Sequence, residues 1–141
     1  MKIPKAAVPA LVVLFALAGL GSARFFAVPT LTRDFAAGGG NPYRTATFLV
    51  EGVKCRDTAE KAFEHLVGLK GLGSAEAYAS RNEIRVTYDP GVTGPQAIRE
   101  ALEGPEFDAA TGEIWFGRFR VIEMDGKPLP EGTGSASPGA P

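Results

Sequence analysis

The amino-acid sequence predicts an α+β fold in which two helices cover one face of an antiparallel sheet. Apolar residues alternate with polar ones near residues 46–51, 75–79 and 84–88, a pattern typical of strands with one buried face. Two other segments carry apolar residues at helical spacing behind residues that cap helices well. A short polar connection joins the second and third strands, so we expect these two to form a hairpin.

Length and composition limit the kinds of protein that this chain can be. Its 141 residues allow one ordinary domain with attachments. A hydrophobic content of 45% and a net charge of −1 exclude a chain that is disordered throughout. The sequence has no basic stripe with interleaved aromatic residues, so we expect no nucleic-acid partner. Proline is concentrated toward the two ends of the chain, and we expect the compact domain at residues 45–126.

Residues 1–28 predict a signal peptide or an N-terminal membrane anchor. Lys2 and Lys5 precede an uncharged run, residues 6–23, and such positive charge keeps an N-terminus cytoplasmic while the following chain crosses the membrane. The run has the length of a signal-peptide core, and it also reaches the lower edge, roughly 17 residues, of what spans a bilayer. We expect export across the cytoplasmic membrane. An outward-facing anchor is favoured over cleavage and release into the periplasm or the extracellular space.

Two segments flank the domain. Residues 29–44 contain three consecutive glycines and an Asn-Pro pair, which is typical of a flexible linker. Residues 127–141 consist mainly of Pro, Gly, Ser and Ala. Such a segment buries too little apolar surface to offset its ordering entropy, so we expect a disordered tail.

The first strand and the first helix of the domain follow each other directly. Ala46, Phe48 and Val50 form the apolar face of the strand. Asp57 is a good N-cap, and Glu60 stands three residues later, as a capping box requires. The helix then presents one apolar face, made by Ala59, Ala62, Phe63 and Leu66, and ends at Gly68 and Gly71.

The remaining elements complete the order β-α-β-β-α-β. Strands near 75–79 and 84–88 meet at a turn of residues 80–82. Thr93 is expected to cap the second helix, with Pro95 in its first turn. An extended C-terminal strand is expected over residues 114–124. This order is the ferredoxin-like arrangement.

From residue 45 to about 104 the sequence resembles the heavy-metal-associated domain family. This family includes copper chaperones, periplasmic mercury-binding proteins and the terminal domains of metal-pumping ATPases. The segment VEGVKCRDTAEKAFEHL resembles the strand, loop and first helix of the family. GLGSAEAYASRNEIRVTYDP resembles its hairpin, and PQAIREALE its second helix. The resemblance implies that residues 45–126 form a heavy-metal-associated-like domain.

The metal motif of the family is incomplete here. Its pattern is glycine, methionine, any residue, cysteine, two residues and a second cysteine. Gly52 and Cys55 match, Val53 replaces the methionine that packs beneath the loop, and Thr58 replaces the second cysteine. The resemblance implies a soft-metal ligand at Cys55, with Gly52, Val53 and Thr58 supporting the loop.

Cu(I), or another soft ion such as Hg(II), needs more than one soft donor. These ions favour two or three thiolate donors, and the hydroxyl of Thr58 is a hard, neutral donor. A second ligand must therefore come from another copy of Cys55, a small thiol or a partner protein.

The chain also contains a histidine and a methionine that could serve as metal ligands. His65 lies seven residues beyond Thr58, about 10 Å along a helix, and is expected to face solvent. Met124 is expected to pack within a strand. Cys55 could equally be an inert core residue. However, its place before a helix N-terminus, beside Arg56, predicts a thiol that is more acidic than usual.

The sequence therefore leaves two alternative functions open. The first is an exported module, tethered to the membrane, that binds or passes a soft metal ion through Cys55. The second is a metal-independent interaction or sensory module that keeps only the fold. In favour of the second are the missing thiol and the apolar residues on both faces of the segment 114–124. The sequence has no resolving cysteine, nucleophile elbow or phosphate loop, so we expect no enzyme activity.

Overall fold

A computed structural model describes residues 7–22, 27–35 and 42–130 of the chain. It contains helices, strands and one 3₁₀ turn at Ala79–Arg81. The elements are, in order, α1 (Ala7–Ser22), β1 (Leu31–Asp34), β2 (Arg44–Glu51), α2 (Arg56–Leu66), β3 (Leu72–Tyr78), β4 (Glu83–Tyr88), α3 (Pro95–Leu102), β5 (Glu106–Asp108), β6 (Glu113–Trp115), β7 (Arg120–Met124) and β8 (Lys127–Pro128).

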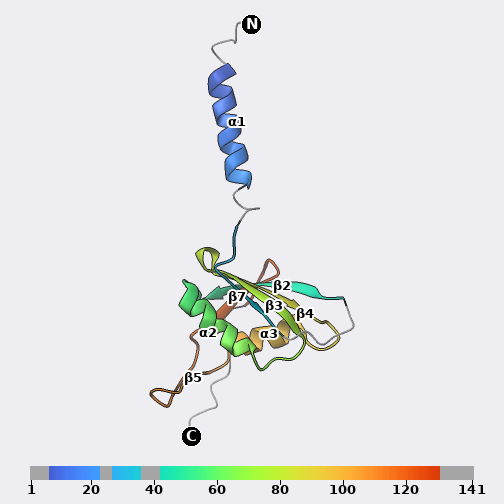
Figure 1. The fold of residues 1–141 in the computed structure, drawn as a ribbon, viewed down its shortest axis with the longest axis vertical. Coiled ribbons are helices and arrows are strands. Elements are labelled where there is room, and N and C mark those ends of the chain that lie inside the picture. The colour runs from blue at the N-terminus through green and yellow to red at the C-terminus, as the bar shows by residue number, and fades with distance from the viewer. Residues whose placement is uncertain (1–6, 23–26, 36–41, 131–141) are drawn as a thin grey trace.

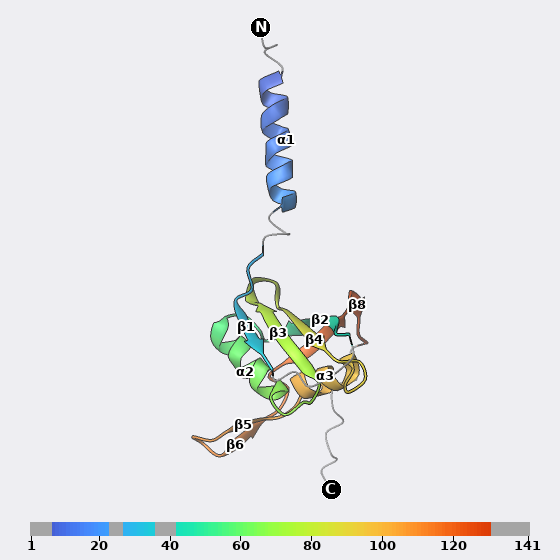
Figure 2. The ribbon, with the colours of Figure 1, turned by 45° about the vertical axis from the view of Figure 1, so that its right-hand side comes forward.

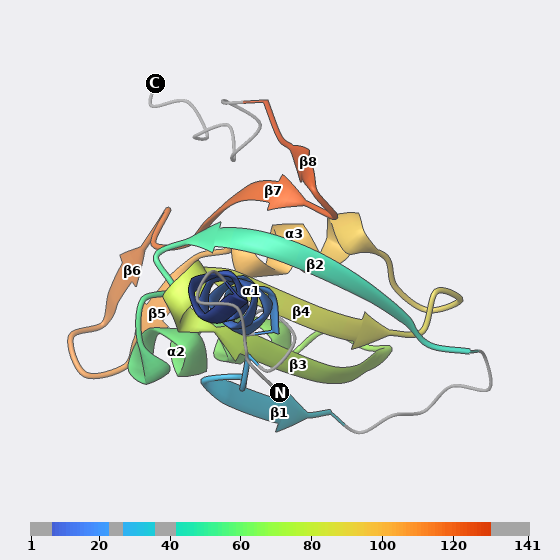
Figure 3. The same ribbon diagram turned by 90° about the horizontal axis from the view of Figure 1, so that it is seen from above.

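The main sheet has the topology that the sequence predicts. Its strand order is β1-β3-β4-β2-β7-β8, and each neighbouring pair is antiparallel. Figure 3 shows these strands side by side, with α3 near β2 and β7 and α2 near β3. Within this sheet, β2, β3, β4 and β7 with their two helices form the βαββαβ unit, so the predicted α+β, ferredoxin-like fold is confirmed. β1 and β8 extend the sheet at its two edges.

The core lies between the sheet and the two helices. The alternation in β2 buries Ala46, Phe48 and Val50 completely, while the two residues between them stay partly exposed. Phe48, Phe63 and Phe119 are the largest side chains that are fully buried. The sheet contributes Ala75, Ala77, Ile84, Val86 and Val121 to the same cluster, and the helices contribute Ala59, Ala62, Leu66, Ile98 and Leu102.

The predicted linker, residues 29–44, contains a strand. β1 pairs with β3, and Leu31 and Phe35 pack against the core. Thr30 fastens the start of this strand, because its backbone N–H donates to the Ala77 carbonyl and its hydroxyl accepts from the Ala79 N–H. The linker prediction is therefore wrong for residues 31–34. The three glycines at 38–40 lie outside the described residues, as does most of the predicted tail, although Lys127 and Pro128 form β8.

The predicted C-terminal strand is divided into two elements. β6 pairs with β5 in a separate two-stranded sheet, and β7 pairs with β2 in the main sheet. Gly117 lies between them with φ +70°, a conformation that ends an extended run. The two-stranded sheet and the residue after it, 106–116, project from the domain (Figure 2). We call residues 106–116 the arm.

Both helix starts differ from the predicted ones by one or two residues. Cys55, not Asp57, is the N-cap of α2. Thr58 therefore occupies the third helical position, which was expected to be that of Glu60. Gly94, not Thr93, is the N-cap of α3, and Pro95 is its first residue. Proline suits that position because its missing N–H would have no partner inside the helix.

The N-terminal helix α1 stands apart from the sheet in Figure 1, and side chains 8–20 are exposed. Among the residues that the structure describes, no helix is both long and apolar enough to cross a membrane. The signal peptide or anchor at residues 1–28 stays a prediction.

Gly52 closes β2 in a conformation that only glycine adopts easily. Its φ is +107°, and a Cβ added there would lie 2.5 Å from the Arg118 carbonyl oxygen and 3.0 Å from Cδ1 of Phe119. The turn that leads to Cys55 is therefore packed directly against the segment that enters β7.

We predict that Gly52→Ala lowers the free energy of unfolding by roughly 2–4 kcal/mol, because it adds a backbone clash to the strain of a positive φ. Gly112→Ala is the matched control, since Gly112 has φ +73° but no atom within 4 Å of its added Cβ. The control should lose only about 1 kcal/mol. Urea denaturation of both variants measures the difference, and equal losses would contradict the packing argument.

Candidate metal centre

Cys55 lies in the open turn between β2 and α2. Its backbone is extended, with φ −152° and ψ 178°, and it forms the N-cap of the helix. Its thiol is free and exposed. The structure therefore excludes the interpretation that Cys55 is a buried core residue.

Thr58 organises this turn. Its hydroxyl oxygen accepts hydrogen bonds from the backbone N–H groups of Lys54, at 2.9 Å, and Cys55, at 3.0 Å. Its single proton points toward the Cys55 carbonyl oxygen, at 2.9 Å, and is shared with Cys55 Sγ, which lies 3.5 Å away. A hydroxyl has one proton and two lone pairs, so these contacts use all of its hydrogen-bonding capacity. Thr58 thus supports the loop and has no lone pair left for a metal ion.

The thiol of Cys55 is more acidic than an ordinary cysteine. Hydrogen bonds from the Thr58 side chain and the Thr58 backbone N–H lower the pKa of Cys55, and the backbone N–H of Asp57 adds to this effect. Slight desolvation and the charge of Asp57 oppose it. Arg56 was expected to acidify the thiol, yet its guanidinium lies 3.5 Å from Glu60 instead. The predicted direction is correct, and its main cause is the capping arrangement.

Two other residues of the predicted motif shape the loop from below. Val53 is fully buried, as expected for the residue that replaces the methionine of the family pattern. Gly52 permits the chain to turn against the Arg118 carbonyl. The sequence does not predict that Arg118 and Phe119 pack against Gly52. Residue 52 and residues 118–119 are far apart in the chain, so no local pattern indicates the contact.

The two other candidate ligands lie elsewhere. His65 is half-buried, not solvent-facing as expected: its Nδ1 lies 3.3 Å from the Ala101 carbonyl, and its ring packs edge-on against Phe119 at 5.5 Å. The prediction is wrong because the flank of α2 that carries His65 packs against α3. Met124 is partly buried and packs against the core within β7, as predicted.

The donors around Cys55 are too few to enclose an ion. Among the described residues, no group of three or more His, Cys, Asp or Glu side chains could hold a metal. The turn therefore presents one acidic, exposed sulfur atom. A soft ion bound there would keep its other coordination positions open to a donor from another molecule.

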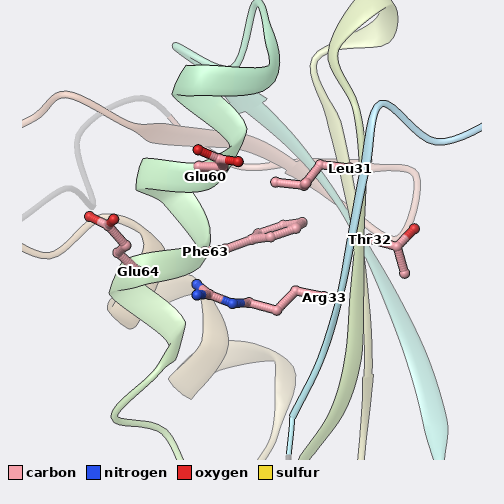
Figure 4. A pocket seen from close by; sticks show the side chains of 6 residues that line it. All are labelled: Leu31, Thr32, Arg33, Glu60, Phe63 and Glu64. Atoms are coloured by element: carbon pink, nitrogen blue, oxygen red, sulfur yellow. The ribbon is translucent and has the colours of Figure 1, made fainter.

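A pocket between β1 and α2 is separate from this turn. Its volume is about 320 Å³, and none of its lining residues belongs to the Cys55 loop. Figure 4 shows Phe63 pointing toward β1, and Arg33 reaching from β1 toward α2. The other lining residues are Leu31, Thr32, Glu60 and Glu64. Carboxylates are hard donors, so this pocket does not suit a soft ion.

Known proteins resemble this chain in sequence and in structure. No family model matches it. The copper chaperone CopZ of Staphylococcus haemolyticus is 32% identical over 59 residues, which are 42% of this chain and 87% of that protein.

Three solved structures also match. A CopZ metallochaperone has a TM-score of 0.43 and 19% identity, over 56% of this chain and 100% of that one. Oxidized MerP from Ralstonia metallidurans CH34 has a TM-score of 0.41 and 18% identity, over 58% and 100% of the two chains. A copper-binding domain from HMA7, a P-type ATPase, has a TM-score of 0.41 and 16% identity, over 58% and 97%.

The fold assignment itself rests on the strand order and the core described above. The sequence match covers most of the copper chaperone and reaches 32% identity. The chain therefore belongs to the heavy-metal-associated domain family.

Proposed function

We propose that this chain binds a soft metal ion, Cu(I) or an ion of similar chemistry, and passes it to a partner protein. The Cys55 thiolate is the ligand that the chain contributes. The partner, or a small thiol that precedes it, contributes the second ligand. The ion is cargo in this scheme, and the role is binding and transfer rather than catalysis.

One observation carries the proposal: Cys55 combines full exposure with a lowered pKa at the mouth of the turn. A soft ion binds the thiolate form, so a lower pKa increases the binding-competent fraction at neutral pH. An ion held by a single protein sulfur is also easy to hand over, because an incoming thiolate can bind before the first one leaves. The name of the sequence relative, a copper chaperone, supports the same ion class.

The location is part of the proposal. The charged N-terminus and the uncharged run at residues 6–23 support export, with the domain outside the cytoplasmic membrane. The run either anchors the domain or is removed.

A metal-independent interaction module is the second candidate. The observation that favours it is the exposed apolar arm, which the metal proposal does not require.

We predict that the purified full chain binds Cu(I) through Cys55 and that Cys55→Ser abolishes this binding. The affinity is measured anaerobically by competition with a chromophoric Cu(I) chelator, with and without a small thiol. Adding the thiol should strengthen binding by the wild type, because it supplies the second soft donor. Equal Cu(I) uptake by the wild type and Cys55→Ser would refute the proposal.

Thr58→Val should raise the pKa of Cys55 toward its ordinary value and weaken Cu(I) binding at pH 7. The methyl group that replaces the hydroxyl cannot donate to the sulfur, so the thiolate fraction at neutral pH falls. Thr58→Ser is the matched control, because it keeps the hydroxyl. Thiolate absorbance against pH reports the pKa, and an unchanged pKa in Thr58→Val would contradict this cause.

Export is checked by fractionating cells that produce the full chain. We expect the domain outside the cytoplasm, and replacing Leu14 and Leu17 with Glu should retain it inside, because two charges break the apolar run. Sequencing the N-terminus of the exported protein distinguishes the anchor from the cleaved form. Recovery of the wild type in the cytoplasm would overturn this part of the proposal.

A further inference from the structure

β1 determines the end of the domain at which the N-terminal segment is attached. Neighbouring strands of the main sheet are antiparallel, so β1 and β4 run in one direction while β3 and β2 run in the other. β2 runs toward the turn that holds Cys55, because α2 begins directly after that turn. We call this end of the sheet the thiol end and the opposite one the far end. β1 therefore begins at the thiol end and runs to the far end (Figure 3).

Backbone hydrogen bonds connect the start of β1 with the end of β2. The Thr30 N–H donates to the Ala77 carbonyl at 2.6 Å, and the Thr30 hydroxyl accepts from the Ala79 N–H at 3.0 Å. Ala79 begins the 3₁₀ turn that Asn82 caps, and the Asn82 carbonyl accepts from the N–H of Val50 at 2.7 Å. In the order β1-β3-β4-β2, three strand spacings separate β1 from β2, which is roughly 14 Å.

Side-chain packing attaches β1 to the domain as well. Leu31 and Phe35 pack against the core, and Phe63 of α2 points toward β1 in Figure 4. All four residues of β1 pair with β3. The chain that precedes Thr30 consequently leaves the domain at the thiol end. Without β1 it would leave from the start of β2, at the far end.

The segment between the uncharged run and β1 is short. The run ends at residue 23, and residues 24–29 separate it from Thr30. A chain extends at most about 3.6 Å per residue, so this segment reaches about 25 Å. The far end lies beyond the thiol end by the length of β2, which has 8 residues and measures roughly 27 Å. An anchor at residues 6–23 would therefore hold the thiol end nearest to the bilayer.

We propose that β1 orients the anchored domain so that Cys55 exchanges its ion with a donor held at the outer surface of the same membrane. This inference rests on the proposed function, which supplies the anchor and the soft ion. The partner is a membrane protein with a soft ligand within about 40 Å of the bilayer surface, a limit set by the reach of residues 24–29 and the spacing from β1 to β2. Sharing one bilayer raises the effective concentration of the two ligands. A soluble carrier gains nothing from this geometry.

The experiment measures how readily a thiol at each end of the sheet reaches the bilayer, without a metal ion. The full chain is reconstituted into phosphatidylcholine vesicles that contain a small fraction of lipid with a pyridyl-disulfide headgroup. A protein thiolate attacks the sulfur attached to the lipid, a mixed disulfide forms, and pyridine-2-thione leaves and is followed by its absorbance. This rate is divided by the rate of the same reconstituted protein with a soluble pyridyl disulfide, which removes the effect of each thiol's own reactivity.

The wild type is compared with Cys55→Ser combined with Lys70→Cys. Lys70 is exposed and precedes β3 at the far end, so this variant moves the thiol from one end of the sheet to the other. We expect the normalised rate of the wild type to be at least about fivefold higher, because effective concentration falls with distance from the anchor. Equal normalised rates would overturn the proposal. So would a chain that does not float with the vesicles, since the anchor would then be absent.

Two variants test the role of β1. Inserting twenty Gly-Ser residues between Val28 and Pro29 leaves the domain unchanged but lengthens the tether, so the wild-type rate should fall toward that of the Lys70→Cys chain. Leu31→Asn with Phe35→Asn removes the packing of β1 and should abolish the difference between the two ends, with circular dichroism checking the fold. A difference that survives the insertion would overturn the orientation by β1.

These rates and the metal proposal are independent of each other. No ion takes part in the disulfide exchange, so a chain that binds no Cu(I) would still show the difference between the two ends. Conversely, equal rates would leave the Cu(I) titration of the purified chain unaffected.

Discussion

The turn from β2 into α2 is the constraint on which the rest of the structure depends. β2 is paired on both sides, by β4 and by β7, and α2 covers the sheet through Phe63 and its neighbours. The connection between them is four residues long. Gly52 turns the chain against Arg118, Val53 fills the space beneath, and the Thr58 hydroxyl satisfies the backbone of Lys54 and Cys55. With these contacts in place, residue 55 can only point outward at the helix N-terminus.

The elements that the sequence predicts well are those in which local pattern and burial agree. β2, β3 and β4 alternate with period two over one buried face, and α2 carries a single apolar stripe, so their types follow from spacing. β1 cannot be predicted in this way, because four residues are too few to show a periodicity. Its formation depends on pairing with β3 some forty residues later. The arm cannot be predicted from periodicity either. Residues 114–124 are apolar on both faces, so the alternation does not show where the chain leaves the sheet.

The candidate site was predictable in position but not in detail. The resemblance placed a cysteine in an open loop, and the structure agrees. The capping rules favoured Asp57 over Cys55, because cysteine is a weak capping residue. In the structure, Thr58 at the third helical position accepts a hydrogen bond from the Cys55 N–H, and this makes Cys55 the N-cap. Residue preferences for capping positions do not include such a contact. His65 was misplaced for the opposite reason: its surroundings come from α3 and from Phe119, far away in sequence.

The exchange of a second thiol for Thr58 changes what the turn can do. With two sulfurs a loop of this kind encloses a two-coordinate ion by itself. With one sulfur, and with the Thr58 oxygen fully occupied by the backbone, the turn holds an ion only as part of a complex with another donor. The same hydroxyl that cannot serve as a ligand acidifies the remaining one. Under the proposed function, this turn therefore shares its ion with a second molecule instead of enclosing it alone.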